Sequence, residues 1–277
     1  MCCENNNLNE RLAKKLLDCE EDVEDRDNYL DIWLNSLEEL SEIEDSFGMN
    51  DQFDLCGKTI LDVGTDAVKP LYIALKLKPT KIIGINDDDL PSFASDIEQK
   101  TKLLLTETRI RFHSCSLFNR ESLNRILKRE KIAKFDFVLI SKTLHHLRTK
   151  KCVVNERNKK HNRDEKHQCR EDEKCCIYGF DAKEVFDRLL ELGKRVIVYE
   201  AFYPQDKDED KERGRGDYFT KNELLQVFKS LLENEKYKIK FIRPQMFDLD
   251  KTTFDRVEPL LRQVDTLCFY VENKQEQ

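Results

Sequence analysis

The chain lacks any long apolar run, both near its start and further along. No stretch of its 277 residues approaches the roughly 18 to 20 apolar residues that a helix needs to cross a bilayer. The opening residues, MCCENNNLNERLAKK, lack the apolar centre of a secretory signal. The 10 cysteines are scattered through a chain rich in lysine and glutamate, so we expect reduced thiols rather than a disulfide framework. These features predict a cytoplasmic protein with no membrane partner.

The chain also lacks an excess of positive charge. Its 48 lysines and arginines are outnumbered by 55 aspartates and glutamates, which gives a net charge of −7. A global field that attracts nucleic acid is therefore not expected, although a local basic patch remains compatible with these numbers. The length predicts one main domain with embellishments.

Residues 1–52 form a charged N-terminal segment outside that domain. From Tyr29 onward, apolar residues recur at spacings of three and four, which predicts an amphipathic helix that ends near Gly48. We expect this helix to cover the main domain, with lining of a substrate pocket as the alternative. The main domain is then expected to span residues 53–277.

Short apolar runs alternate with helical patterns through the main domain. This alternation predicts a parallel sheet with helices on both faces. Two further strands follow a late helix with no clear helical pattern between them, so we expect them to lie antiparallel at an edge of the sheet. The predicted strands are, in chain order, 58–63, 81–86, 109–115, 135–141, 194–201, 237–244 and 266–273.

Two polar stretches interrupt the alternation, at about 150–176 and 204–216. We predict loops or disordered insertions here, each after the carboxyl end of a strand, where open α/β sheets bind ligands. The first has a modest excess of lysine and arginine and could contact RNA or a protein as a recognition loop. It also contains residues of zinc-ligand type but no C-x-x-C pair, so we predict no metal site, with a structural zinc as the alternative. These residues are Cys152, His161, His167, Cys169, Cys175 and Cys176.

The first strand-to-helix turn retains a single glycine. A dinucleotide-binding loop would read G-x-G-x-x-G, but Gly64 is followed by Asp66 and Lys69 in the other glycine positions. Asp62 lies in the same turn, and the run NDDD at 86–89 closes the next strand. Carboxylates gathered at this edge disfavour a pyrophosphate and favour a ligand with a positive centre, an ammonium group and a ribose, such as S-adenosylmethionine.

Several segments, in the right order, resemble the class I S-adenosylmethionine-dependent methyltransferases over about residues 57–273. They are ILDVGTDAVKPLYIAL as the first motif, IIGIND, FDFVLISKTLHHL as the fourth strand with its turn, GDYFTKNELLQVFKSLLENEKYKIKFIRP and TLCFYVEN. The resemblance implies a Rossmann-like α/β three-layer sandwich. Its mostly parallel seven-stranded sheet would have the order 3-2-1-4-5-7-6, with an antiparallel last strand. It also implies S-adenosylmethionine as the cofactor.

The resemblance further implies where the cofactor binds. The chain departs from the family pattern at several of these positions: Asp66 and Val68 replace glycines, Asn86 replaces the acid that holds the ribose with Asp87 next to it, and Ser116 replaces an acid near the adenine. The residues implied to bind the cofactor are Asp62, Gly64, Thr65, Asp66, Asn86, Asp87, Ser116, Leu117 and Ser141.

His145 and His146 are the candidate catalytic residues, because they follow the fourth strand and a histidine can deprotonate a hydroxyl or an amine near neutral pH. The alternative is that LHHL only builds the turn. Glu200 and Tyr203, after the fifth strand, either line the pocket or are exposed loop residues. The turn reads SKTL and lacks the D/N/S-P-P-Y/F signature, which disfavours methylation of base amino groups.

The sequence thus predicts a methyltransferase whose acceptor, whether RNA, protein or small molecule, is not identified. A methyltransferase-like scaffold without catalysis is the alternative that Asp66, Asn86 and Ser116 suggest. A nucleotide-dependent oxidoreductase is disfavoured by the acidic edge and by the predicted antiparallel last strand.

Overall fold

The structure is a computed structural model. It describes residues 55–65, 68–87, 94–95, 98–99, 102, 105, 108–147, 149–152, 176–179, 181–203 and 219–274. The predicted N-terminal helix, Asp66, and the interiors of both predicted insertions lie outside these residues. So does most of the helix expected before the third strand.

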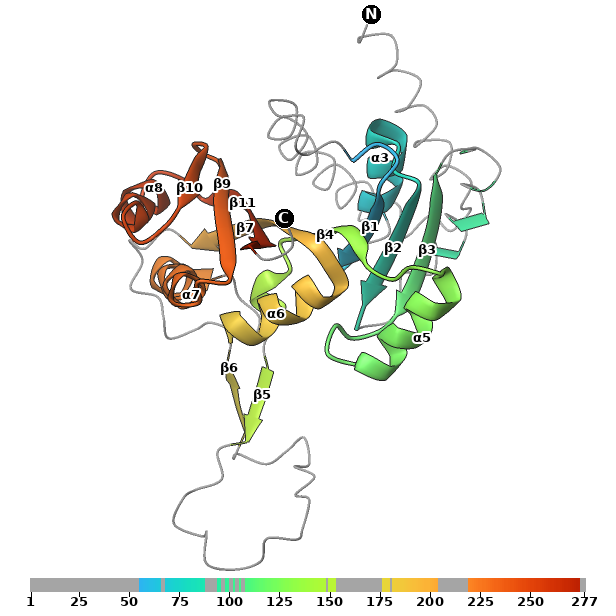
Figure 1. The fold of residues 1–277 in the computed structure, drawn as a ribbon, viewed down its shortest axis with the longest axis horizontal. Helices are drawn as coiled ribbons and strands as arrows, with labels where there is room; N and C mark the ends of the chain where they lie inside the picture. Colours follow the sequence, from blue (N-terminus) through green and yellow to red (C-terminus); the bar gives the residue numbers. More distant parts are fainter. Residues whose placement is uncertain are drawn as a thin grey trace, which may run out of the picture.

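Nine of the described strands form one sheet, and two others form a separate ribbon (Figure 1). Its order is β3-β2-β1-β4-β7-β11-β9-β10, and the short β8 pairs with the end of β7. The strands are β1 (Thr59–Val63), β2 (Lys81–Asn86), β3 (Arg109–Ser114), β4 (Phe135–Ser141), β7 (Gly193–Tyr203), β8 (Phe219–Thr220), β9 (Tyr237–Arg243), β10 (Phe247–Leu249) and β11 (Thr266–Asn273).

This order confirms the predicted arrangement 3-2-1-4-5-7-6 and adds two short strands. Strands β3, β2, β1, β4 and β7 are parallel, and β11 lies antiparallel between β7 and β9. The prediction missed β10, which pairs antiparallel with β9, and β8. Phe247 holds β10 in place, because its ring stacks on that of Phe241 at a centroid distance of 4.8 Å.

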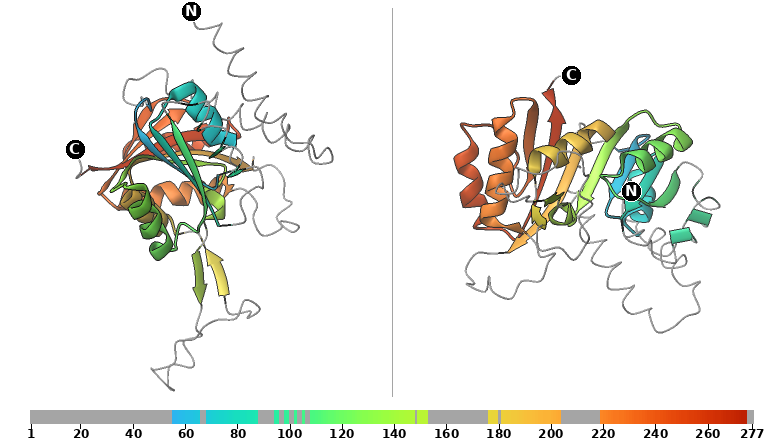
Figure 2. Two further views of the ribbon diagram at one scale, coloured as in Figure 1. Left: turned by 90° about the vertical axis from the view of Figure 1, so that its right-hand side faces the viewer. Right: turned by 90° about the horizontal axis from the view of Figure 1, so that it is seen from below.

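Helices cover both faces of the sheet, as Figure 2 shows. On one face, α3 (Val68–Leu77) packs through Leu71 and Ile73 against strand residues such as Ile60 and Ile82. On the other face, Leu61 and Ile83 belong to a larger core that includes residues of three helices. These helices are α5 (Arg120–Glu130), α6 (Ala182–Leu192) and α7 (Lys221–Glu233). The predicted three-layer sandwich is therefore present.

Polar side chains fix where these helices begin. Asn119 accepts a hydrogen bond from the Ser122 backbone at the start of α5, and Asp181 accepts one from the Glu184 backbone at the start of α6. At α7, Thr220 and Glu223 form a reciprocal capping box. Gly193 follows α6 directly and is the first residue of β7.

The first insertion is more ordered at its ends than the sequence predicted. Residues 149–152 form β5 (Thr149–Cys152), which pairs antiparallel with β6 (Cys176–Gly179). Figure 1 shows this ribbon extending away from the main sheet. Backbone pairing compensates here for a sequence with few apolar side chains, because it satisfies the peptide groups of both segments.

The segment between the last two large strands was predicted to be irregular, but it contains two short helices. They are η4 (Phe254–Arg256) and α8 (Val257–Leu261). Val257 and Leu261 are buried in the core beside α7, which explains why these few residues are ordered.

No helix in the described part of the chain is both long enough and apolar enough to cross a membrane. Among the described cysteines, Cys56 is exposed, whereas Cys115 and Cys268 are buried.

Candidate functional site

The carboxyl ends of the parallel strands bring most of the predicted site residues to one edge of the sheet. Asn86 ends β2, Ser141 ends β4, and Gly64 directly follows β1. In register, Val63 lies beside Ile85 and Ile140, so these three ends are level with one another. The site is therefore the edge where ligands bind in open α/β sheets.

The turn after β1 is tied to β2 through its own backbone. The N–H groups of Gly64 and Thr65 both donate to the carbonyl oxygen of Ile85, at 2.8 and 3.1 Å. The side-chain amide of Asn86 donates to the carbonyl oxygen of Thr65 at 3.3 Å. Backbone N–H groups are the donors that bind pyrophosphate in dinucleotide-binding turns. Here two of them are engaged within the protein, which argues against a phosphate ligand at this turn.

Gly64 is required at this turn by its backbone and by its neighbour Thr143. Its φ of +72° lies in the left-handed region, which favours glycine. A Cβ atom on Gly64 would lie 2.2 Å from Cγ2 and 2.5 Å from Oγ1 of Thr143. The hydroxyl of Thr143 donates to the carbonyl oxygen of Ser141 at 2.9 Å. The single remaining glycine thus has a structural explanation: it admits the turn after β4.

Lys69, in the last glycine position of the dinucleotide pattern, joins two parts of the same edge. It lies in the first turn of α3 and is buried, with 5% of its surface exposed. Its ammonium group donates to the carbonyl oxygen of Ser141 at 3.4 Å. The lysine therefore fills space that a glycine would leave open for a ligand.

His145 and Glu200 form a buried pair at the same edge. Nδ1 of His145 lies 2.8 Å from Oε1 of Glu200, and their side chains are 3% and 0% exposed. The same carboxylate oxygen accepts the backbone N–H of Ala201 at 3.2 Å. The other oxygen, Oε2, is buried and has no hydrogen-bond partner among the described residues. A carboxylate oxygen accepts hydrogen bonds, so the geometry of this contact suits the tautomer that carries its proton on Nδ1.

Glu200 lies inside β7, within the range 194–201 predicted for the fifth strand, and β7 continues to Tyr203, which was expected after it. The side chain of Glu200 is fully buried, so the alternative of an exposed loop residue is wrong for this residue. Phe202 and Tyr203 extend the strand because their backbones pair with Phe219 and Thr220 of β8.

The two histidines differ in their surroundings. Both belong to η2 (Leu144–His146), where His145 is buried and His146 is exposed. Their ring centroids lie 4.0 Å apart, and the ring of Phe219 is nearly perpendicular to that of His145, with 6.3 Å between their centroids. His145 is thus held in one orientation, whereas His146 is the histidine that solvent reaches.

The remaining predicted residues differ in how far their side chains are exposed. Asp62 is buried in β1, and Asp87 is exposed directly after β2. Ser116 is half-buried and its hydroxyl oxygen accepts the backbone N–H of Phe118 at 3.4 Å. The side chain of Leu117 is buried in the core beside α5 and α6, so only its backbone could face the site.

This set of groups fits S-adenosylmethionine better than a nucleotide diphosphate. The carboxylates of Asp62 and Asp87 suit an ammonium group and ribose hydroxyls. The turn that would hold a pyrophosphate has its first two N–H groups engaged with Ile85. Among the described residues, no cluster of three or more histidine, cysteine, aspartate or glutamate side chains could hold a metal ion. The interior of the Cys/His-containing insertion lies outside those residues.

The pairing of His145 with Glu200 and the contact of Thr143 with Gly64 could not be found from the sequence. The partners are far apart in the chain, and neither pair follows a sequence motif. The one available signal was position, since each partner lies near the carboxyl end of a predicted strand.

Several solved structures have a fold similar to that of this chain. A cyclopropane-fatty-acyl-phospholipid synthase-like protein from Lactobacillus casei is 13% identical, with a TM-score of 0.50, over 95% of this chain and 99% of that one. A SAM-dependent methyltransferase from Aquifex aeolicus is 16% identical, with a TM-score of 0.37, over 83% and 88% of the two chains. The magnesium protoporphyrin IX methyltransferase from Synechocystis, solved with bound SAH, is 11% identical, with a TM-score of 0.44, over 85% and 83%.

No protein-family model matches the sequence, and no curated protein matches it either. At identities this low, the likeness concerns the fold. Together with the strand order, it confirms the predicted Rossmann-like three-layer fold.

Proposed function

We propose that this protein is a methyltransferase that uses S-adenosylmethionine at the carboxyl edge of its sheet. The observation that carries the proposal is the buried pair of His145 and Glu200, placed at that edge of a methyltransferase-like sheet. The acceptor is RNA, a protein or a small molecule that presents a hydroxyl or an amine.

Asp87 and Asn86 would hold the ribose, and Asp62 would balance the positive charge of the methionine part. This assignment rests on residue chemistry: carboxylates accept charge-assisted hydrogen bonds, and they attract a cation. When bound, the cofactor supplies an electrophilic methyl group on a sulfonium. Gly64, Thr65, Asp66, Ser116, Leu117 and Ser141 would complete the walls of its site.

His145 is the proposed general base. Its Nδ1 proton is engaged by Glu200, so Nε2 would accept the proton that the acceptor loses. Glu200 fixes the ring and its tautomer and would stabilise the imidazolium after the proton moves, as a buried acid does in a catalytic triad. His146, exposed beside it, is the second candidate base and would contact the acceptor.

A scaffold with the same fold is the second candidate function. Three contacts favour it: Thr143 against Gly64, the Asn86 amide on Thr65, and the buried Lys69 on Ser141. Each engages a group that would otherwise be available to the cofactor.

Calorimetric titration with S-adenosylmethionine and with its demethylated product separates the two candidates. The methyltransferase proposal expects heat from both ligands and none from NAD, which carries a pyrophosphate. No heat and no thermal shift from either ligand at about millimolar concentration, where even a weak site is occupied, would favour the scaffold.

A further inference from the structure

Positive charge is concentrated on one flank of the domain, on and around β3 and α5. Leaving aside Arg120, whose charge is paired with Glu191, seven cations and three carboxylates there give a net charge of +4 in a chain whose net charge is −7. We call this surface the basic flank. Its cations are Lys81, Arg109, Arg111, Arg125, Lys128, Arg129 and Lys131, and its carboxylates are Glu98, Glu121 and Glu130.

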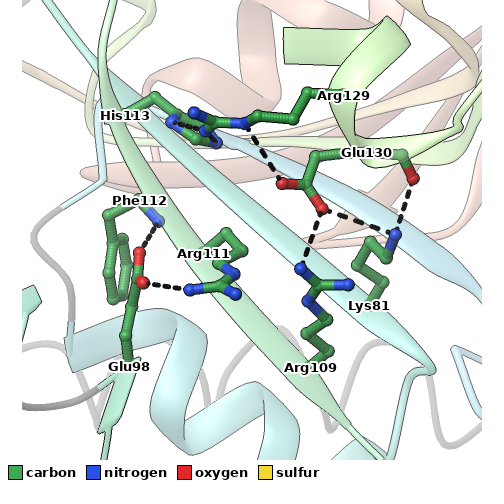
Figure 3. A network of polar contacts seen from close by, with 8 residues as sticks. All are labelled: Lys81, Glu98, Arg109, Arg111, Phe112, His113, Arg129 and Glu130. Atoms are coloured by element: carbon green, nitrogen blue, oxygen red, sulfur yellow. Dashed lines mark hydrogen bonds and ion pairs between the residues drawn. The ribbon is translucent and has the colours of Figure 1, made fainter.

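Two rows of side chains run along the flank. Alternate residues of a strand share a face, so Arg109, Arg111 and His113 form one row on β3. Residues four apart share one side of a helix, so Arg125 and Arg129 form the other row on α5. Figure 3 shows Arg129 reaching from the helix to His113, with Nη2 at 2.8 Å from Nδ1 and 3.0 Å from Nε2. The two rows therefore meet.

A buried carboxylate organises the cations without neutralising them. Glu130 is 3% exposed and faces Lys81 at 3.5 Å, Arg129 at 3.7 Å and Arg109 at 3.8 Å (Figure 3). One negative charge thus meets three positive ones. The side chains of Arg109 and Arg129 remain 50% and 63% exposed, so their charge reaches solvent.

His113 does not add to this charge near neutral pH. Burial, followed by the positive charge of Arg129, lowers the pKa of His113 below its ordinary value, and Arg111 acts in the same direction. Glu130 and Glu98 oppose the shift but do not outweigh it. The Arg129 guanidinium therefore rests against a neutral ring, which leaves its charge available to an anion.

At the outer edge of β3, a side chain already occupies a backbone N–H group that another strand would need for pairing. Glu98 accepts the backbone N–H of Phe112 at 2.6 Å and also accepts a hydrogen bond from Arg111 at 2.7 Å (Figure 3). A carboxylate on an edge N–H blocks the approach of another strand. A partner of this flank would thus be recognised through charge.

We propose that the basic flank binds the phosphodiester backbone of a nucleic acid. Four of its seven cations are arginines, whose planar groups suit phosphate oxygens. A membrane surface fits less well, because peripheral binding normally adds apolar anchors to basic residues. Among the described residues, Met246 is the one exposed large apolar side chain, and it lies between β9 and β10 at the opposite edge of the sheet. The proposal does not depend on methyl transfer.

The test is binding of a fluorescent single-stranded RNA of about 20 nucleotides and mixed sequence, followed by anisotropy at two salt concentrations. The variant combines Arg125→Gln, Lys128→Gln and Arg129→Gln, all exposed on α5. The control combines Lys229→Gln, Lys251→Gln and Arg262→Gln, which make the same charge change on the exposed surface at the other end of the sheet. We expect about 10-fold or greater loss of affinity in the variant and less than about 3-fold in the control. The salt dependence should also flatten in the variant, because fewer counterions are released.

Two further measurements test the same proposal without relying on the variant. Hydrogen exchange of the unaltered protein should show slower exchange in α5 and β3 when the RNA is added, whether or not the variant folds. Vesicles of phosphatidylserine and phosphatidylcholine should not bind the protein. Failure of the unaltered protein to bind RNA at low salt, equal weakening by the control, protection elsewhere only, or vesicle binding without RNA binding would each overturn the proposal. None of these results bears on cofactor binding, which is measured separately.

Discussion

The imidazole of His145 and the carboxylate of Glu200 lie 2.8 Å apart in the interior, although 55 residues separate them in the chain. The contact joins the turn after β4 to the neighbouring strand β7. Both side chains are almost fully buried, so the hydrogen bond is shielded from water. Such a pair holds one ring orientation and one tautomer, which a positioned base requires.

Glu200→Ala should destabilise the protein more than Glu200→Gln. Alanine leaves the Nδ1 proton of His145 and the N–H of Ala201 without their acceptor, at a cost of about 1 to 3 kcal/mol for each buried group. Glutamine keeps a carbonyl oxygen that can accept both hydrogen bonds. Urea unfolding of the two variants gives the comparison.

Nitrogen NMR of the histidine rings serves as the independent check on this pair. At neutral pH, His145 should carry its proton on Nδ1 in the unaltered protein. Equal stability of the two variants, or a proton on Nε2, would contradict the role assigned to Glu200.

Gly64→Ala should destabilise the protein by about 2 to 4 kcal/mol, because alanine is strained at a φ of +72° and its Cβ would overlap Thr143. Thr143→Ala removes the two nearest atoms of the overlap, so the double variant should recover about 1 kcal/mol relative to additivity. Thermal unfolding of both single variants and of the double variant measures this coupling. Strict additivity would mean that Thr143 does not press on Gly64.

Asp136 should make stability depend on pH in the acid range. Burial alone would raise the pKa of Asp136, but hydrogen bonds from Lys194 and Thr59 outweigh it and lower the pKa below the ordinary value. A lowered folded-state pKa contributes stability that is present above the unfolded pKa. That stability is lost as the pH falls through the folded pKa. The contacts involved join the starts of β1, β4 and β7.

Asp136→Asn should therefore cost about 1 to 2 kcal/mol near pH 7, and less at about pH 3, which lies below the ordinary aspartate pKa, so that part of the stabilisation is lost there. Denaturant unfolding at the two pH values measures the difference. Asp265→Asn, at an exposed position before β11, is the matched control and should change little at either pH. A cost that stays constant with pH would show that the charge of Asp136 does not act through its partners.

Asp87→Asn should weaken binding of S-adenosylmethionine by roughly 10-fold, because it replaces a charge-assisted hydrogen bond to the ribose with a neutral one. Asp87 is exposed, so the fold should persist. Asp255→Asn, exposed in η4 far along the chain, is the control and should leave the affinity unchanged. Calorimetry gives both values, and equal affinity in all three proteins would remove Asp87 from the proposed site.

Much of the fold follows from periodicity. The runs that become β1, β2 and β4 are mostly apolar because both faces of a parallel sheet are covered, and this pattern is local in the sequence. β10 and α8 were missed because they span three and five residues. Elements of that length are stabilised by tertiary contacts, such as the stacking of Phe247 on Phe241, rather than by their own pattern.

The placement of the candidate residues at one edge of the sheet was predictable, but their contacts were not. Motif positions brought Gly64, Asn86 and Ser141 to one edge, as the strand ends confirm. Sequence alone could not reveal that the Asn86 amide binds the backbone of Thr65, or that Lys69 turns to Ser141. Such bonds depend on side-chain directions across neighbouring strands, which no spacing in one segment specifies.

A crystal structure of the protein with the demethylated cofactor product tests the central claim most directly. The account predicts the product at the carboxyl ends of β1, β2 and β4, with its ribose hydroxyls on Asp87 or Asn86 and no contact to the Gly64 N–H group. A diphosphate nucleotide bound at Gly64 instead, or a saturating concentration of product that leaves this edge without ligand density, would contradict it.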